Sequence, residues 1–120
     1  MITPRKHEMD ECCYHLPFGV LRLIGGQTGL RRIEPLDARP RGCGSAAPAS
    51  LRAAVAALDD WAAGRAPDLA GVRLDWSEAT YFQRLVWSRL IDVGFSHVVS
   101  YSGLARLCGR PRAARAVARA

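Results

Sequence analysis

The residues of this chain best suited to covalent chemistry are its four cysteines, Cys12, Cys13, Cys43 and Cys108. A cysteine attacks as the thiolate, and no two of these residues form the C-x-x-C pair of redox or zinc motifs. Adjacent residues of a strand point to opposite faces, so Cys12 and Cys13 are badly placed to share a metal ion. The N-terminus lacks the apolar core of a secretory signal, so we expect a cytoplasmic protein with reduced thiols rather than a disulfide framework.

The arginines near the C-terminus form a second distinctive set. Residues 81–120 hold seven arginines and one acidic residue, Asp92, whereas residues 1–80 are balanced. The last third therefore carries the whole formal net charge of +6. This asymmetry indicates a surface that faces a polyanion, with nucleic acid as the first candidate. A solvated basic helix face is the alternative.

The composition excludes several classes of protein. With 49% hydrophobic and 23% charged residues, the 120-residue chain resembles an ordinary globular protein and is neither disordered nor collagen-like. No run approaches the roughly 18 apolar residues that a membrane helix needs. We therefore expect one ordinary domain or two very small ones, with no membrane contact.

Short extended runs dominate the first part of the chain. Residues 12–16, 20–24 and 30–35 are strand-like and are separated by segments rich in Gly and Pro, which predicts an antiparallel meander. The composition of residues 36–49 predicts a loop. Ser50 is a suitable N-cap for a helix that Gly64 ends, and residues 72–74 could add one more strand.

Helix signals dominate the second part. Thr80-x-x-Gln83 has capping-box form and opens a helix that Gly94 ends. Ser100 caps a short helix through Cys108, Gly109 breaks it, and Pro111 begins a further helix, Pro111–Ala120. A helix, a Gly-containing turn and an Arg-rich helix are typical of a helix-turn-helix, although this pattern alone is a weak signal.

Three stretches together make the chain recognisable. They are Thr80–Trp87, Val99–Ala105 and Gly109–Val117, supported by Leu16–Leu23 with Gly29-Leu30. In order and spacing they closely resemble the methylated-DNA–protein-cysteine methyltransferases, which repair 6-O-alkylguanine. The resemblance is strong over about residues 80–117 and weaker over 14–36.

The resemblance implies an α+β fold in two parts. Residues 1–76 would form a ribonuclease H-like domain, an antiparallel sheet with a helix. Residues 77–120 would form an incomplete winged-helix-like domain whose helix-turn-helix enters the minor groove of double-stranded DNA. A cysteine of the family accepts the alkyl group irreversibly from a flipped guanine, and no cofactor is needed.

The resemblance also suggests roles for individual residues. Tyr101 matches the tyrosine that crowds the phosphate of the flipped nucleotide, and Arg115 matches the arginine that fills the gap in the base stack. Arg110 and Arg112 are candidate phosphate contacts, and Ala114 belongs to a small-residue helix that can approach the duplex closely. Taken without context, Tyr101 would be a core residue and Arg115 one more exposed arginine. Phe82, Trp87 and Leu104 are interpreted as core.

The chain departs from the family where the chemistry would be. The family's nucleophile lies in a Pro-Cys-His-Arg motif after an Asn-Pro hinge, and neither occurs in the 120 residues. We interpret Cys108 as a small buried residue rather than a substitute nucleophile. Some relatives bind zinc in the N-terminal domain, but His7, Cys12, Cys13 and His15 do not assemble their ligand set, so no metal is expected.

We therefore expect an incomplete member of the family that is inactive alone, marginally stable and monomeric, with apolar surface exposed on helices 80–93 and 100–108. Three alternatives stay open. The chain could be a non-catalytic module that senses lesions, a small helix-turn-helix regulator, or a remnant without function.

Overall fold

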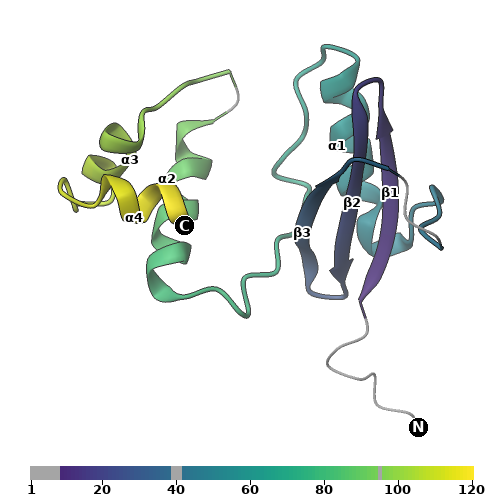
Figure 1. The fold of residues 1–120 in the computed structure, drawn as a ribbon, viewed down its shortest axis with the longest axis horizontal. Helices are drawn as coiled ribbons and strands as arrows, with labels where there is room; N and C mark the ends of the chain where they lie inside the picture. The colour runs from purple at the N-terminus through teal and green to yellow at the C-terminus, as the bar shows by residue number, and fades with distance from the viewer. Residues whose placement is uncertain (1–8, 39–41, 95) are drawn as a thin grey trace, which may run out of the picture. The chain divides into compact units, whose positions relative to one another are not determined.

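The computed structural model describes residues 9–38, 42–94 and 96–120 of the chain. It divides into two compact units, Met1–Asp75 and Trp76–Ala120, which are described separately below. The first contains a sheet and a helix, and the second contains three helices, so the α+β class is confirmed (Figure 1).

The sheet of the first unit is an antiparallel meander. Strands β1 (Asp10–Leu16), β2 (Gly19–Gly26) and β3 (Gly29–Leu36) lie in the order β1-β2-β3. The expected strands are therefore confirmed, each slightly longer than its sequence signal. Cys12 pairs with Leu23 of the central strand, and Cys13 pairs with Arg22, so the two cysteines lie on opposite faces as expected.

The segment after β3 is tied to the outer edge of β1. Cys13 and Cys43 form a disulfide, and the Cys13 amide donates a 2.8 Å hydrogen bond to the Gly44 carbonyl. The expectation of reduced thiols is wrong for this pair. The pairing joins residues 30 positions apart, so it depends on how the loop crosses β1 and has no local signature.

A short 3-10 helix, η1 (Ala49–Leu51), leads into helix α1 (Arg52–Ala62), which covers one face of the sheet (Figure 1). Leu51, Ala54, Cys12 and Leu23 form the core between them. Ser50 does not cap the helix, because its hydroxyl donates to Asp10 Oδ2 of β1 at 2.8 Å. Gly64 ends the helix with φ 76°, a conformation that glycine adopts without strain.

The end of the first unit lies against β3. The Leu30 amide donates to the Arg73 carbonyl, and the Asp75 amide donates to the Leu30 carbonyl, so the expected strand at 72–74 is reduced to a single parallel bridge. The Asp75 carboxylate is 2% exposed and accepts hydrogen bonds from Thr28 and Arg31. This buried ion pair fixes the chain just before the second unit begins.

The second unit consists of α2 (Tyr81–Val93), α3 (Tyr101–Leu107) and α4 (Ala114–Arg119). The capping box is confirmed: Thr80 Oγ1 accepts from the Gln83 amide, and Gln83 Oε1 accepts from the Thr80 amide. The C-cap Gly94 has φ 83° and ends α2 as expected. The fourth helix begins at Ala114, three residues after the expected start at Pro111.

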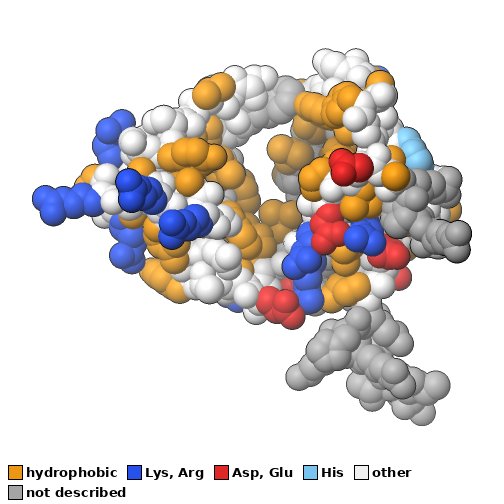
Figure 2. Space-filling model, viewed as in Figure 1, with side chains coloured by type: hydrophobic (Ala, Val, Ile, Leu, Met, Phe, Trp, Pro, Cys, Tyr) orange, Lys and Arg blue, Asp and Glu red, His pale blue; other side chains and the backbone are white. Residues whose placement is uncertain are grey.

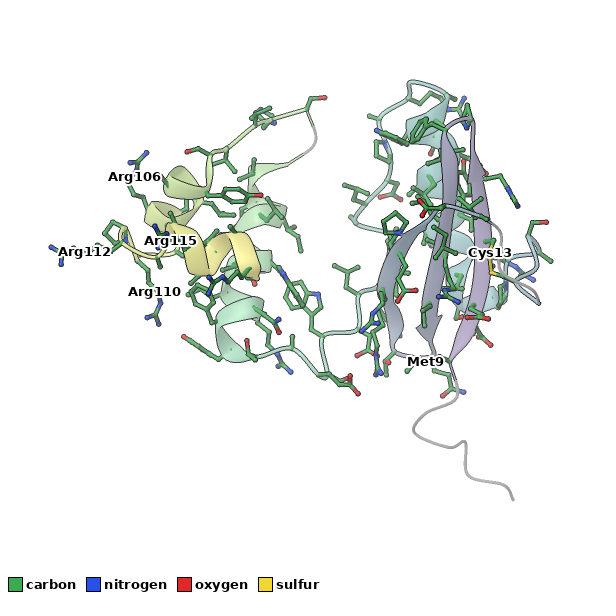
Figure 3. The ribbon with its side chains drawn as sticks, in the orientation of Figure 1. Met9, Cys13, Arg106, Arg110, Arg112 and Arg115 are labelled. Carbon is green, nitrogen blue, oxygen red and sulfur yellow. A yellow bond between two sulfur atoms is a disulfide. The ribbon has the colours of Figure 1, made fainter. Side chains whose placement is uncertain are left out.

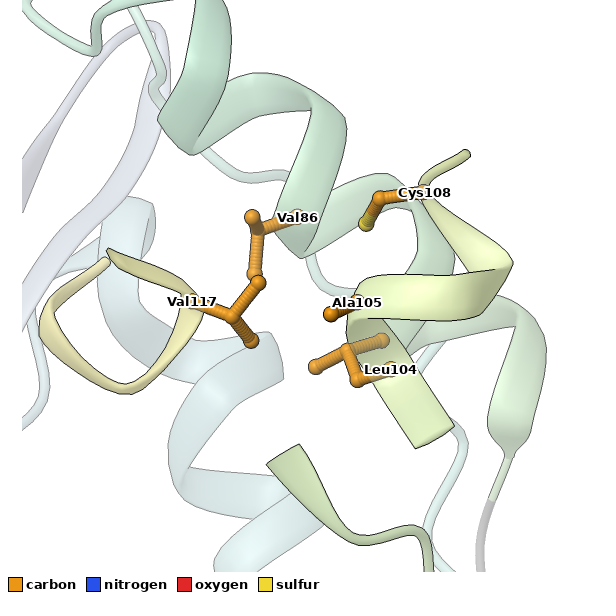
Figure 4. Close-up of a cluster of buried hydrophobic side chains, with 5 residues drawn as sticks. All are labelled: Val86, Leu104, Ala105, Cys108 and Val117. Carbon is orange, nitrogen blue, oxygen red and sulfur yellow. The ribbon is translucent and has the colours of Figure 1, made fainter. Parts of the chain in front are cut away.

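The core of this unit is small and contains five buried residues, Val86, Leu104, Ala105, Cys108 and Val117 (Figure 4). Phe82, Leu85 and Trp87 pack around it, and Trp87 Nε1 donates to the Ala120 carbonyl at 3.1 Å. These positions confirm the interpretation of Phe82, Trp87 and Leu104 as core. Large apolar side chains of α2 and α3 are nevertheless exposed, as expected: Leu90, Ile91 and Leu107. Val98, between the two helices, is exposed as well.

Candidate nucleic-acid interface

The α3–turn–α4 segment carries every candidate DNA-binding residue. Ser100 Oγ accepts a 2.9 Å hydrogen bond from the Gly103 amide and so fixes the start of α3, as the sequence predicted. Gly109, with φ 72°, turns the chain after Cys108, and α3 packs against α4. Leu104, Ala105 and Val117 anchor both helices in the core. Between these anchors Cys108 is buried, and the arginines are exposed.

Arginines crowd this outward surface (Figures 2 and 3). Arg106, Arg110, Arg112 and Arg115 are all exposed. In the part of the chain that the structure describes, none of the four forms an ion pair with an acidic side chain. Unpaired guanidinium groups gathered on one surface attract a polyanion and can each bind a phosphate through two N–H donors.

The two arginines of α2, by contrast, form contacts with residues in or next to that helix. Arg84 donates to the carbonyls of Trp76 and Ala79, and Arg89 pairs with Asp92 at 3.4 Å. These contacts use the donors of both groups for structure. The free positive charge of the second unit therefore concentrates on α3, the turn and α4.

Arg110 lies near an aromatic ring, and Tyr101 is exposed to solvent. The guanidinium carbon of Arg110 lies 5.9 Å from the centre of the Phe82 ring, within the range of a cation–π contact. Tyr101, the first residue of α3, is 63% exposed. Its hydroxyl is therefore accessible, unlike that of a tyrosine packed into a core.

The α3–turn–α4 segment holds Tyr101 on α3, Arg110 and Arg112 in the turn, and Ala114 and Arg115 on α4. Ala114 is half-buried at the start of α4, and Arg115 is its exposed neighbour. Arg106 belongs to the same surface but was not among the residues selected from the sequence. Its position between buried Ala105 and buried Cys108 on a seven-residue helix was the signal that could have identified it.

The cysteines are unavailable for chemistry at a surface. Cys12 and Cys108 are free but buried, and Cys13 and Cys43 are joined. Burial raises the pKa of the Cys12 thiol, which opposes formation of the thiolate. Cys108 lies in the helical core, as the sequence interpretation expected.

Over residues 9–38, 42–94 and 96–120, no three His, Cys, Asp or Glu side chains gather closely enough to hold a metal ion. His7 lies outside the described residues. None of the described helices is both long and apolar enough to cross a bilayer.

Known proteins resemble this chain both in sequence and in fold. Residues 81–120 match the DNA-binding domain of 6-O-methylguanine DNA methyltransferase. The methylated-DNA–protein-cysteine methyltransferase of Saccharomyces cerevisiae is 51% identical over 41 residues, which cover 34% of this chain and 22% of the yeast protein.

Two crystal structures from Mycobacterium tuberculosis extend the comparison to nearly the whole chain. The 6-O-methylguanine methyltransferase has a TM-score of 0.74 at 28% identity, covering 93% of this chain and 68% of that one. The OGT in complex with DNA has a TM-score of 0.72 at 30% identity, covering 91% and 66%.

A three-stranded meander with one helix, followed by three further helices, makes the chain an α+β protein, and residues 81–120 match a DNA-binding domain. In sequence over residues 81–120, and in fold over most of its length, the chain is similar to the methylated-DNA–protein-cysteine methyltransferases. It spans about a fifth of the yeast relative's length and about two thirds of the mycobacterial structures.

Proposed function

We propose that this chain acts in DNA repair by binding double-stranded DNA that contains alkylated guanine, through the surface of α3, the turn and α4. The observation that carries the proposal is the group of four exposed, unpaired arginines within the segment that matches the family's DNA-binding domain. Because phosphate contacts release counterions, most of the affinity would be electrostatic.

Within this proposal, the residues have distinct roles. Tyr101 presses on the phosphate of the flipped nucleotide. Arg110 and Arg112 bind other phosphates of the duplex. Arg115 enters the gap left by the extruded base, where its planar guanidinium stacks and donates to the orphaned partner. Ala114, with its small side chain, lets the helix approach the groove closely.

Fluorescence anisotropy with two labelled duplexes tests the proposal. One duplex carries a single 6-O-methylguanine, and the other carries guanine. We expect binding of both, tighter for the lesion, with log K falling linearly as log salt rises. Affinity that does not change with salt would exclude the arginine surface as the contact.

The catalytic step of the family transfers the alkyl carbon from the guanine oxygen to a cysteine sulfur, with cleavage of the carbon–oxygen bond and formation of a thioether. We propose that residues 1–120 alone do not perform this transfer. The support is that two cysteines are buried thiols and two form a disulfide. A buried thiol cannot reach the alkylated guanine, and it lacks a neighbouring group that could deprotonate it.

Duplex DNA with a radiolabelled methyl group on guanine tests this second statement. After incubation with the 120-residue chain, we expect the label to stay with the DNA. Label that migrates with the protein would overturn the statement, and peptide mapping would then identify the acceptor.

A non-catalytic module that recognises lesions is the alternative function, and the same burial of the cysteines favours it. It predicts a preference for alkylated duplex without any transfer. A dimeric helix-turn-helix regulator instead predicts a preference for one base sequence, which the guanine duplex would reveal when its sequence is varied.

A further inference from the structure

Arg106 lies on the side of α3 that faces away from the core. Its neighbours Ala105 and Leu104 are buried, and so is Cys108 two residues later. On a helix with 3.6 residues per turn, these three residues define one face and leave Arg106 on the opposite one. Figure 3 shows its side chain extending from the same end of the unit as Arg110, Arg112 and Arg115.

The guanidinium of Arg106 is directed back along α3 toward the start of the helix. Its Nη2 atom lies 3.9 Å from the point that a Cβ on Gly103 would occupy. Gly103 is in the first turn of α3, where its amide donates to Ser100 Oγ, and Tyr101 precedes it by two residues. The charged end of Arg106 therefore lies beside the turn that carries Tyr101.

No described acidic residue neutralises Arg106, and its guanidinium forms no hydrogen bond with another described residue. A structural role would require such a partner. In a helix-turn-helix the first helix crosses the DNA backbone, while the second enters the groove. An unpaired guanidinium on the outer face of α3 is suited to that backbone.

We propose that Arg106 binds a DNA phosphate next to the one that Tyr101 contacts, so that phosphate binding extends from the turn and α4 onto α3. This inference rests on the proposed DNA binding. Because a phosphate contact carries no sequence information, Arg106 would strengthen binding equally for every duplex. It would act on affinity and not on recognition of the lesion.

The test measures binding of an unmodified duplex by anisotropy over a range of KCl concentrations. Removing one phosphate contact with Arg106→Ala should lower the slope of log K against log salt by about 1. Affinity at low salt should fall several-fold, and the lesion duplex should show the same fold-change. Arg106→Lys keeps the charge and should retain the slope.

Arg52→Ala is the matched control, because Arg52 is an exposed helical arginine of the first unit with no ion pair among the described residues. It should leave the slope unchanged. If the wild-type chain fails to bind DNA, the proposed function is wrong. If the wild type binds and Arg106→Ala behaves like Arg52→Ala, the function stands and the inference about Arg106 is wrong.

Circular dichroism verifies that the variants are folded. If Arg106→Ala loses helix, Arg106→Gln, which has a long neutral side chain, gives the same comparison.

Discussion

The guanidinium groups of the arginines in the second unit differ in the contacts that they form. Arg84 is bound to backbone carbonyls, Arg89 to Asp92, and Arg110 lies over Phe82, whereas Arg115 is exposed without an ion pair among the described residues. An unrestrained guanidinium at the start of α4 can move into a gap in the base stack. Its contribution should therefore depend on whether a base is flipped.

Arg115→Ala should weaken binding of the 6-O-methylguanine duplex more than binding of the guanine duplex. The loss for the lesion duplex should be about 1–3 kcal/mol, which is roughly 5- to 150-fold in affinity. Anisotropy titrations with both duplexes measure it. Arg119→Ala, which removes another exposed arginine from the same helix, should weaken both duplexes equally. Equal losses from Arg115→Ala would assign it to the phosphates.

Tyr14 makes the alkaline stability of the first unit dependent on one proton. Its hydroxyl donates to Asp59 Oδ1 at 2.7 Å, and this hydrogen bond, with smaller effects of burial and of the Asp59 charge, raises the Tyr14 pKa. A raised pKa in the folded state means that this contribution is complete below the unfolded value of about 10 and disappears as pH rises through the folded value.

Absorbance at 295 nm detects tyrosinate and measures this effect directly. In folded Tyr14→Phe, a component that titrates above the pH of a free tyrosine should be missing. The variant should also lose less stability between neutral and alkaline pH than the wild type. If the component missing from Tyr14→Phe titrates at the pH of a free tyrosine, the Asp59 hydrogen bond does not form in solution.

At the scale of the elements, the start of α2 depends on a reciprocal pair of hydrogen bonds between Thr80 and Gln83. Thr80→Ala removes the acceptor of the Gln83 amide and should destabilise the second unit by about 1 kcal/mol. Denaturant unfolding followed by helix ellipticity measures the change. Thr80→Ser keeps the hydroxyl and should lose little, so a similar loss from both variants would indicate a cause other than the cap.

Local signals predicted the elements well, and failures occurred where a distant residue competed. Thr80 and Ser100 cap their helices as predicted because their partners lie three residues away. Ser50 has the right residue type, but its hydroxyl is used by Asp10, which is 40 residues earlier. Pro111 could begin a helix, yet the chain needs a turn until Ala114 for Val117 to reach the core.

The candidate site shows the same division. The positions of Tyr101, Arg110, Arg112, Ala114 and Arg115 followed from one contiguous stretch of sequence. The disulfide could not be predicted, since nothing near Cys13 or Cys43 indicates that residues 30 positions apart meet. Their roles at DNA stay predictions that the binding experiments address.

At the scale of the whole chain, the disulfide should stabilise the first unit. Closing a loop of about 30 residues lowers the entropy of the unfolded chain, which corresponds to about 3 kcal/mol. Denaturant unfolding of the oxidised protein should therefore show higher stability than unfolding in dithiothreitol. The double variant Cys13→Ser and Cys43→Ser should match the reduced protein and should not respond to the reductant. A reductant effect on the double variant would exclude the disulfide as the cause.

The second unit should be the less stable of the two. It has a five-residue buried cluster, no sheet, and exposed Leu90, Ile91, Val98 and Leu107. We expect amides of α2–α4 to exchange with solvent faster than those of β1–β3, and we expect the purified chain to aggregate on mild heating. A single cooperative transition at high temperature, with uniform exchange protection, would contradict both expectations.

The backbone contacts along the two outer strands have a consequence for association between molecules. Gly44 covers the outer edge of β1 at Cys13, and Arg73 with Asp75 covers the outer edge of β3 at Leu30. An open strand edge is a template onto which another chain can add a strand, and at Cys13 and Leu30 this template is bonded to the chain's own backbone. Only the cover on β1 depends on a bond that a dithiol can cleave. Reduction would therefore release the covering segment from β1 at Cys13 and would make strand pairing between molecules easier at that edge.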